Sequence, residues 1–295
     1  MAAWSGGIFD PSRNRLVIWG GGHGDYAGNE IYAFDVNSLS WQRVTNPSTP
    51  YPFGNPPSNP VNSDGTPASL HTYDGLAYLP GSDSLFAVGG SKWPGGEPSN
   101  LTWTFNFGTS RWTKRADAPY PGVDLVTAYD PASGKVYAAG PFSNQPLIEY
   151  DPVNNVWTGR GDPIDYGGMN AAFDPVRKKM VVIGRGRAFA YNLNVGGFSA
   201  KQSISPGACA AGEAPGIAYD STRDRIVAWS GGTKVCVLDP NSNSWTTIQA
   251  EPGNSVTPTA PVEAGTYGRF QYVPSKNAFI LVNGVNQNVY AYKMP

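Results

Sequence analysis

The sequence has few charged residues and no concentration of positive charge. Charged side chains make up 15% of the 295 residues, and the formal net charge is −1. The longest run of lysine or arginine is the three residues Arg177 to Lys179. Proteins that follow a phosphate backbone need clustered positive charge, so we expect no nucleic-acid partner.

Long apolar segments are also lacking. The longest apolar runs, Met180 to Ile183 and Ala278 to Val282, have the length of β-strands. A membrane-spanning helix needs about 20 apolar residues, so we expect no membrane span. The first residues, Met1 to Trp4, contain neither a basic segment nor an apolar core for export. A mature domain expressed from an engineered start would look the same.

Helical periodicity is missing, whereas glycine, proline and aromatic residues are plentiful. No window of helical length repeats its apolar residues every 3.6 positions, and the chain contains 36 Gly, 27 Pro, 9 Trp, 16 Tyr and 12 Phe. Glycine and proline interrupt helices, while aromatic residues favour strands. The composition therefore predicts an all-β protein made of short strands and tight turns.

A repeated spacing organises the chain. Each repeat has a strand that closes on a turn such as Asp10-Pro11, then a strand that ends in glycine, then a strand that ends in Asp or Asn. Five times that Asp or Asn is followed six positions later by an aromatic residue: Asp35 and Trp41, Asn106 and Trp112, Asp151 and Trp157, Asn192 and Phe198, Asp239 and Trp245. Each unit predicts four antiparallel strands. One such sheet cannot bury both faces, so the units predict a radial array.

The glycines that end the second strand, the strand-ending Asp and the Trp of the fourth strand are marks of the kelch repeat. The chain resembles the kelch-type β-propellers, the architecture of the galactose oxidase central domain, over nearly its whole length. This resemblance implies one domain of six four-stranded blades, at residues 4–45, 71–116, 123–161, 167–202, 213–249 and 266–295. The sixth unit ends before its expected aromatic residue and lacks its outer strand. Either that blade has three strands, or a segment before Met1 supplies the fourth.

An insertion separates the first two repeats. Trp41 and Trp112 lie 71 residues apart, whereas later repeats are spaced by 41 to 47 residues. The surplus, residues 46–70, is rich in Pro, Ser, Asn and Gly. It is either an inert linker or a lid or rim over a functional site.

The propeller architecture assigns loops to two faces. Loops between second and third strands and loops between blades share one face, which we call the histidine face because it receives His23 and His71, the two histidines of the chain. On the opposite turn face lie hairpins such as 10–14, which we expect to be plain solvated turns. Candidate catalytic residues on the histidine face are His23, His71, Tyr73, Tyr166, Arg187 and Arg269. Candidate substrate-binding residues are Asp25, Tyr26, Asn29, Trp93, Asn144, Asn170, Arg185 and Tyr267.

These residue types match the chemistry of β-elimination. That reaction needs a group that neutralises a uronate carboxylate, a base and an acid. The sequence predicts a polysaccharide lyase acting on uronate-containing glycans, with Arg187 or Arg269 as neutraliser, His23 or His71 as base, and Tyr73 or Tyr166 as acid. Some lyases of sulfated algal glycans are similar in being propellers with His, Tyr and Arg sites, although no contiguous motif of theirs occurs here. The alternative is a non-catalytic propeller that binds a glycan or a protein, with the same side chains in packing or surface roles.

Other chemistries are less favoured. A glycosidase needs two facing carboxylates, and no spacing pairs the available ones, Asp25, Glu30, Asp124, Glu213 and Glu263. Galactose oxidase binds copper through two His and two Tyr, one joined to a Cys, and this chain has no adjacent Tyr-His pair. We therefore expect no cofactor and no metal, with a metal between His23 and His71 as the alternative.

The chain has only two cysteines. Cys209 lies in the loop that enters the fifth blade, and Cys236 begins the third strand of that blade. A disulfide between them is reasonable, and two buried thiols are the alternative. A disulfide indicates an oxidising compartment, so we expect an exported bacterial protein, secreted or periplasmic.

Overall fold

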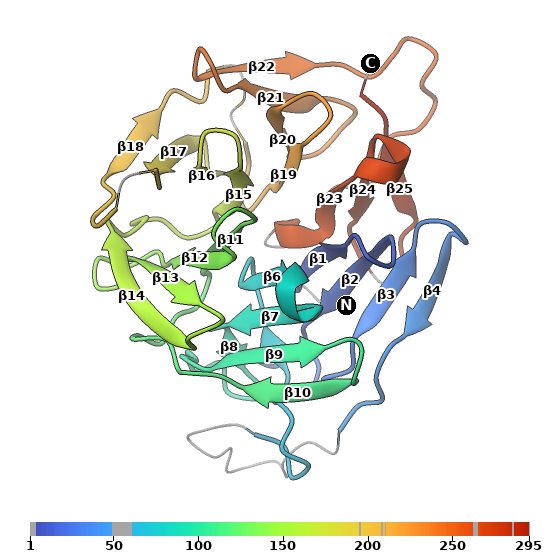
Figure 1. Ribbon diagram of the computed structural model, residues 1–295. Helices are drawn as coiled ribbons and strands as arrows, with labels where there is room; N and C mark the ends of the chain where they lie inside the picture. The colour runs from blue at the N-terminus through green and yellow to red at the C-terminus, as the bar shows by residue number, and fades with distance from the viewer. Residues whose placement is uncertain are drawn as a thin grey trace.

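The chain forms a six-bladed β-propeller. The computed structural model describes residues 4–48, 61–194, 196–207, 209, 211–261, 265–284 and 286–294. In Figure 1 six antiparallel sheets surround a common axis, five with four strands and the last, in red, with three. The predicted all-β fold class is confirmed, including the missing outer strand of blade six. Among the described residues, no helix is long and apolar enough to cross a membrane.

The strands follow one another from the axis outward in every blade. Blade one contains β1 (Gly6–Asp10), β2 (Arg15–Trp19), β3 (Tyr32–Asp35) and β4 (Ser40–Arg43). Blade two contains β6 (Leu76–Leu79), β7 (Ser84–Val88), β9 (Thr102–Asn106) and β10 (Arg111–Lys114). Blade three contains β11 (Val126–Asp130), β12 (Lys135–Ala139), β13 (Leu147–Asp151) and β14 (Val156–Gly161). Blade four contains β15 (Asn170–Asp174), β16 (Lys179–Gly184), β17 (Arg187–Asn192) and β18 (Lys201–Ile204).

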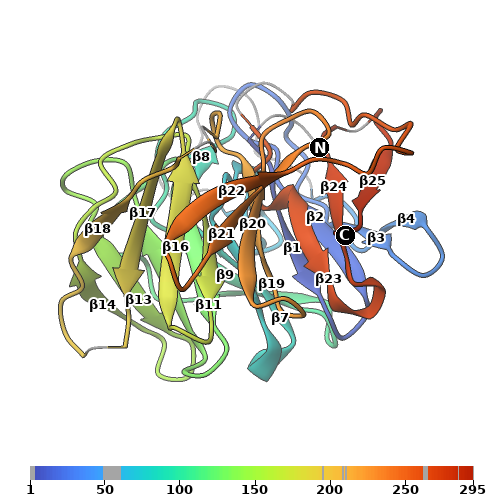
Figure 2. The same cartoon turned by 90° about the horizontal axis from the view of Figure 1, so that it is seen from above.

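Blade five contains β19 (Gly216–Asp220), β20 (Arg225–Trp229), β21 (Val235–Asp239) and β22 (Ser244–Ile248). Blade six contains β23 (Phe270–Val273), β24 (Ala278–Val282) and β25 (Val289–Tyr292). A separate small sheet pairs β5 (Leu70–His71) with β8 (Ser91–Lys92). Three short helical turns, η1 (Pro80–Ser82), η2 (Tyr267–Arg269) and η3 (Pro274–Lys276), complete the described elements. Figure 2 shows β8 at the upper edge, on the histidine face.

The six-residue spacing from Asp to an aromatic residue has a local cause. The Asp35 carboxylate accepts the N–H groups of Asn37 and Ser38 at 2.8 and 2.7 Å, which closes the turn after β3. The turn sets a register in which Phe34 lies opposite Trp41. Aromatic pairs across two strands stabilise a sheet, so the spacing encodes both the turn and the pair.

Blade four departs from this spacing. Tyr191 lies opposite Lys201, so the outer strand begins later than the pattern predicts. Phe198 lies outside β18 and is 66% exposed. The prediction that Phe198 occupies the outer strand is therefore wrong, because this turn is longer than those of the other blades.

Residues with a left-handed backbone conformation, that is, with positive φ, form two rings at the two ends of the six inner strands. One ring lies six positions before the last residue of each inner strand and comprises Trp4, Tyr73, Asp124, Gly168, Ala214 and Tyr267. The other ring lies four positions after the last residue of each inner strand and comprises Asn14, Asp83, Gly134, Lys178, Asp224 and Asn277. Positive φ interrupts a strand, so each ring marks the point where the chain leaves the sheet. The first ring, which we call the mouth ring, lies on the histidine face.

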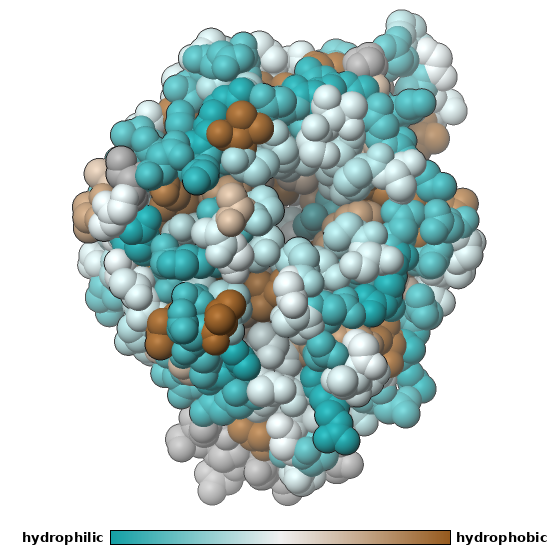
Figure 3. All heavy atoms as spheres, viewed as in Figure 1, coloured by the Kyte–Doolittle hydropathy of each residue, from teal (hydrophilic) through white to brown (hydrophobic). Residues whose placement is uncertain are grey.

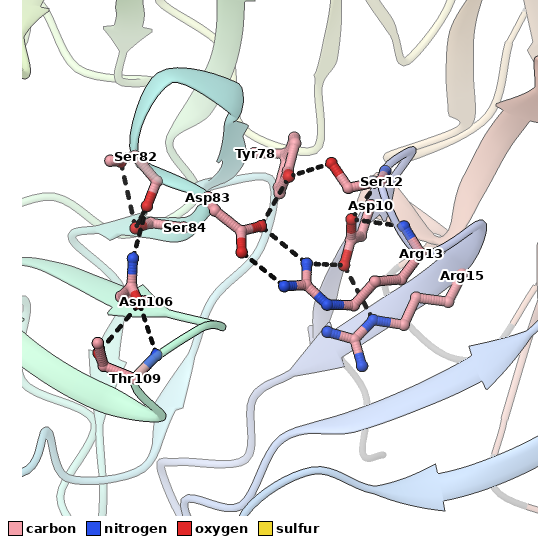
Figure 4. A network of polar contacts seen from close by, with 10 residues as sticks. All are labelled: Asp10, Ser12, Arg13, Arg15, Tyr78, Ser82, Asp83, Ser84, Asn106 and Thr109. Atoms are coloured by element: carbon pink, nitrogen blue, oxygen red, sulfur yellow. Dashed lines mark hydrogen bonds and ion pairs between the residues drawn. The ribbon is translucent and has the colours of Figure 1, made fainter.

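The hairpins of the turn face fasten neighbouring blades. Figure 4 shows Arg13 of blade one reaching both carboxylate oxygens of Asp83 in blade two, at 2.7 and 2.5 Å, while also contacting Asp10. The hydroxyl of Tyr78 donates to Asp83 as well, at 2.9 Å. The same clamp joins later blades through Arg177, Asp224 and Tyr219, and through Arg223, Asn277 and Tyr272. The expectation of plain solvated turns is therefore wrong.

The inner strands enclose a central channel of about 430 Å³. Figure 3 shows a hollow near the centre of the turn face. Small apolar residues such as Ala77, Ala128 and Ala172 line the channel. Asp74 also lines it, and its carboxylate accepts the N–H of Ala171 at 2.9 Å. Burial raises the pKa of Asp74 well above its ordinary value. The channel is thus mainly apolar, with one buried carboxyl group.

Candidate functional site

The loop between β2 and β3 packs against the segment that carries His71. In β5, His71 lies opposite Ser91 of β8, which fixes the segment between blades one and two. The N–H of Gly22 donates to Ser69 Oγ at 2.7 Å. A Cβ atom on Gly22 would lie 2.3 Å from the main-chain nitrogen of His71, so only glycine fits there. This close approach brings the loop of His23 and Asp25 to His71.

His71 is buried and bonded to Asp25. Its Nε2 lies 2.7 Å from Asp25 Oδ2, and because a carboxylate only accepts, Nε2 carries the hydrogen. The ring of Trp4 stacks on His71 with centroids 4.8 Å apart. Burial lowers the pKa of His71, and the bond with Asp25 opposes that shift. His71 is only 2% exposed, so it is placed to hold other groups rather than to meet a ligand.

His23 is exposed beside the buried His71. Its ring meets His71 edge-on with centroids 5.6 Å apart, as the assignment of both histidines to one face predicts. Its backbone has a left-handed φ of 41°. A Cβ atom on Gly96 would lie 2.9 Å from the His23 ring, so the glycine leaves room for this ring position. The structure separates the two histidines: His23 is open to a ligand and His71 supports it.

Two tyrosines of the mouth ring continue the site. The ring of Tyr73 lies edge-on to His71 at 6.0 Å and to Tyr267 at 5.7 Å. The hydroxyl of Tyr73 is 2.9 Å from Ser91 Oγ. Burial raises the pKa of both tyrosines, so both hydroxyls keep their protons at neutral pH. Tyr73 is half-buried, whereas Tyr267 is buried. Tyr73 is the better placed of the two to donate a proton to a ligand.

Asp124 is a mouth-ring residue whose importance the sequence does not reveal. Burial raises its pKa to about 6. One carboxylate oxygen accepts the N–H of Gly168 at 2.5 Å, and a contact with the hydroxyl of Tyr267 opposes the rise in pKa that burial causes. Sequence reasoning counts Asp124 only among the loose carboxylates of a glycosidase. Its alignment with Tyr73 and Tyr267, six positions before the end of an inner strand, is the signal that places it in the site.

The two exposed arginines of blade four have different surroundings. Arg185 forms an ion pair with Glu213, and the two side chains lie against Gly168. Glu213 raises the pKa of Arg185. Arg187 instead places its guanidinium 4.1 Å above the ring of Tyr166. Arg185 therefore adjoins the Asp124 side of the mouth, whereas Arg187 and Tyr166 contact each other on blade four.

Three candidate residues have structural roles. Arg269 is fully buried and donates to the carbonyl groups of Thr266, Asn283 and Gly265, at 3.1, 3.0 and 2.7 Å. Burial lowers its pKa to about 10. Asn170 is buried and donates to the carbonyl of Pro215. Asn29 is buried and joins the insertion to blade one through Ser48, Thr66 and Pro67. Arg269 in particular is not placed to neutralise a ligand carboxylate.

The remaining candidates lie apart from one another. Tyr26 is 43% exposed, and its hydroxyl donates to Glu30 at 2.5 Å, which helps raise the pKa of Tyr26 to about 12. Trp93 is buried beside β8, and Asn144 is exposed in blade three. Glu263 and residues 49–60 of the insertion lie outside the described residues. Within the described part of the chain, no three His, Cys, Asp or Glu side chains form a group that could hold a metal ion.

The cysteines are bonded to each other. Cys209 and Cys236 form a disulfide with Cα atoms 5.6 Å apart. Both residues pack within the buried cluster between blades four and five. The disulfide ties the incoming loop of blade five to β21.

Comparisons with known proteins extend the fold assignment. No protein-family model and no curated protein sequence matches the chain. The chain is similar to the crystal structure of a structural genomics protein of unknown function from Bacteroides thetaiotaomicron. The TM-score is 0.56 and the sequence identity 11%, over 95% of this chain and 67% of that one. The likeness shows the fold alone.

The arrangement on the histidine face has the elements of proton-transfer chemistry. An exposed imidazole at His23 can accept a proton, and the hydroxyl of Tyr73 can donate one. The carboxyl of Asp124 can change its protonation state near pH 6. Arg185 supplies a cation beside it, already paired with Glu213. These groups come from blades one to four: His23 and Tyr73 both contact His71, and Arg185 lies near Asp124.

Proposed function

We propose that the protein is a kelch-type propeller whose histidine face binds a uronate-containing polysaccharide and cleaves it by β-elimination. The observation that carries this proposal is the exposed ring of His23 in contact with the buried His71, which is bonded to the exposed Asp25, beside Tyr73. A buried neutral imidazole held by a carboxylate gives His23 a fixed neighbour. Fixed positions of acid and base are what proton transfer requires.

In the proposed reaction His23 takes the proton from the sugar carbon next to the carboxylate. The electron pair of that C–H bond forms a carbon–carbon double bond as the glycosidic C–O bond breaks. Tyr73 gives its proton to the leaving oxygen and regains one from solvent. Arg185 binds the uronate carboxylate, in place of the buried Arg269, and below about pH 6 the protonated carboxyl of Asp124 also donates to it. Donors aimed at this carboxylate stabilise the charge that develops on proton removal.

A second function, glycan binding without cleavage, is favoured by one observation. The guanidinium of Arg185 is paired with Glu213, so binding a uronate there requires the ligand to compete with that pair. The rings of Trp4 and Tyr73 at the mouth can stack on sugars without any proton transfer. A protein partner for the same face is the other form of this alternative.

The disulfide between Cys209 and Cys236 supports export of the protein. Disulfides persist in oxidising compartments, so we propose a secreted or periplasmic location. Fractionation of the native host with antibody detection tests this location independently of the activity.

Product analysis distinguishes elimination from binding and from hydrolysis. The protein is incubated with uronate polysaccharides that differ in linkage, and the products are examined by mass spectrometry. Elimination gives oligosaccharides lighter by one water than hydrolysis products. Retarded migration in gels containing the same polysaccharides, without cleavage products, would instead support the binding function. Failure of both readouts with a folded protein would contradict both functions for those glycans.

A further inference from the structure

Blade six leaves an edge strand without a neighbour. Its sheet has the order β23, β24, β25, whereas each other blade has a fourth strand outside the third. In the described chain no strand pairs with the outer side of β25. An open edge presents main-chain donors and acceptors to any extended segment that can align with it.

In blades two and three the fourth strand supplies a tryptophan that packs toward the preceding blade. In blade two, Trp112 contacts Trp19 of blade one with ring centroids 4.8 Å apart, and Phe105 at 5.2 Å. In blade three, Trp157 contacts Tyr150 at 4.8 Å and Phe86 of blade two at 6.2 Å. The tryptophan is therefore a wedge between two blades as well as part of its own sheet.

The corresponding place in blade six is a cavity of about 220 Å³. We call it the blade-six socket; its walls include Trp229, Phe270, Leu281, Tyr290, Tyr292 and Glu251. An engineered apolar cavity of about 150 Å³ holds benzene, so the socket has room for an aromatic ring. Because the socket lies beside the edge strand, one segment can pair with β25 and fill the socket at the same time.

Comparison of blade six with the equivalent positions of blade two shows which side chain the socket can hold. Trp229 ends β20 as Trp19 ends β2, and each indole N–H donates to a carbonyl of the following loop, at 3.0 Å to Gly232 and 2.9 Å to Asn29. Tyr292 pairs with Phe279 in the register in which Phe105 pairs with Leu85. The socket thus offers the two rings that hold Trp112 in blade two, Trp229 for Trp19 and Tyr292 for Phe105.

A second observation concerns the hydroxyl of Tyr292. This hydroxyl is buried and has no hydrogen-bond partner among the described residues. At the equivalent position in blade three, the hydroxyl of Tyr150 donates to Asn155 at 2.7 Å. Asn155 belongs to the hairpin that leads into the fourth strand of that blade. The hydroxyl of Tyr292 therefore lacks the kind of contact that a fourth strand and its hairpin supply.

We propose that β25 and the blade-six socket bind an extended segment of a partner chain, which adds as a fourth antiparallel strand and inserts a tryptophan. The chain's own outer strands indicate the chemistry of the segment: Trp is followed by Thr at Trp112, Trp157 and Trp245. A basic residue two positions after the Trp, as at Lys114, complements Glu251 on the wall. Strand addition gains affinity from main-chain hydrogen bonds and specificity from the side-chain pocket. This site includes none of the residues of the candidate functional site around His23 and does not rest on the proposed function.

The test uses a fluorescent peptide with the sequence of residues 109–117, which contains Trp112 and Lys114, and measures its anisotropy with the 295-residue protein. Saturable binding at one peptide per protein is expected. Replacing the peptide's Trp by Ala should weaken binding at least about 10-fold, since buried aromatic anchors dominate such interfaces. In the protein, Ala291→Pro in β25 should abolish binding because proline disrupts strand pairing. Gln42→Pro in the exposed β4 is the matched control and should bind normally.

Folding of the proline variants is checked by circular dichroism. Tyr292→Phe is a second variant that removes only the hydroxyl and should weaken binding without unfolding blade six. Equal binding of the Trp and Ala peptides, or no saturable binding, would overturn the proposal. A dimer in sedimentation experiments that Ala291→Pro dissociates would overturn it as well, because it would assign the edge to a second copy of the chain.

Discussion

Replacing Arg269 by methionine distinguishes a structural arginine from a catalytic one. The guanidinium holds three buried carbonyl groups, those of Gly265, Thr266 and Asn283. Methionine fills much of the same space but leaves all three without a donor. Each unsatisfied buried carbonyl costs about 1–3 kcal/mol, and removal of a buried charge offsets part of that sum. We expect a net loss of about 3–5 kcal/mol in the free energy of unfolding.

The assay is thermal and denaturant unfolding of Arg269→Met beside Arg185→Met. For a protein of this size the expected loss lowers the melting temperature by roughly 6–10 °C. Arg185 is exposed and pairs with Glu213 at the surface, so Arg185→Met should cost no more than about 1 kcal/mol. Arg185→Met should instead weaken binding of uronate glycans. If Arg269→Met were as stable as the parent and selectively lost activity, the structural reading of Arg269 would be refuted.

Three further predictions concern the histidine face and the disulfide. Gly96→Ala adds a Cβ atom 2.9 Å from the His23 ring, at a residue whose φ is +86°. We expect glycan turnover to fall at least about 10-fold because the His23 ring is displaced. We also expect unfolding experiments to show a loss of about 1–2 kcal/mol in stability, because alanine is strained at positive φ. Burial raises the pKa of Asp124 to about 6, so its protonated form stabilises the fold; this contribution is complete below about pH 4 and is lost as pH rises through about 6. The parent should lose roughly 3 kcal/mol relative to Asp124→Asn across that range, and parallel pH profiles of unfolding would contradict this assignment. Reduction of the bond between Cys209 and Cys236, 27 residues apart, should cost about 3–4 kcal/mol in denaturant unfolding, and no shift of the midpoint would contradict it.

The fold could be predicted from the sequence because its main rules are local. The turn at Asp35 and the pair of Phe34 and Trp41 both follow from residues within one hairpin. Phe198 shows the limit of such a rule. The turn after Asn192 is longer, and spacing alone does not reveal where pairing resumes, at Lys201.

The candidate site was less predictable because burial and blade-to-blade contacts decide its roles. Sequence places His23 and His71 on one face, but only the packing of Trp4 and Asp25 shows which histidine is covered. Arg269 lies in a loop that points to the mouth, yet main-chain carbonyls from two loops surround it. Such contacts join residues with no regular spacing in the chain.

The hairpins of the turn face show the same limit. Asp10 and Arg13 form a sequence pattern typical of a solvated turn, and their partner Asp83 lies 70 residues further on. Only the closed ring of blades brings Arg13 to Asp83. The left-handed residues of the mouth ring share no residue type, and their common spacing becomes visible only once the inner strands of the structure are aligned by their last residues.

The central claim is that His23 is the base of an elimination reaction. The most direct measurement follows the ultraviolet absorbance of unsaturated uronate products while the parent protein and His23→Gln act on the same uronate polysaccharides. We expect absorbance to rise with the parent and to stay flat with His23→Gln, whose circular dichroism and unfolding should match the parent. Equal rates for the two proteins, or a flat trace for the folded parent on every uronate polysaccharide while it binds them, would contradict the claim.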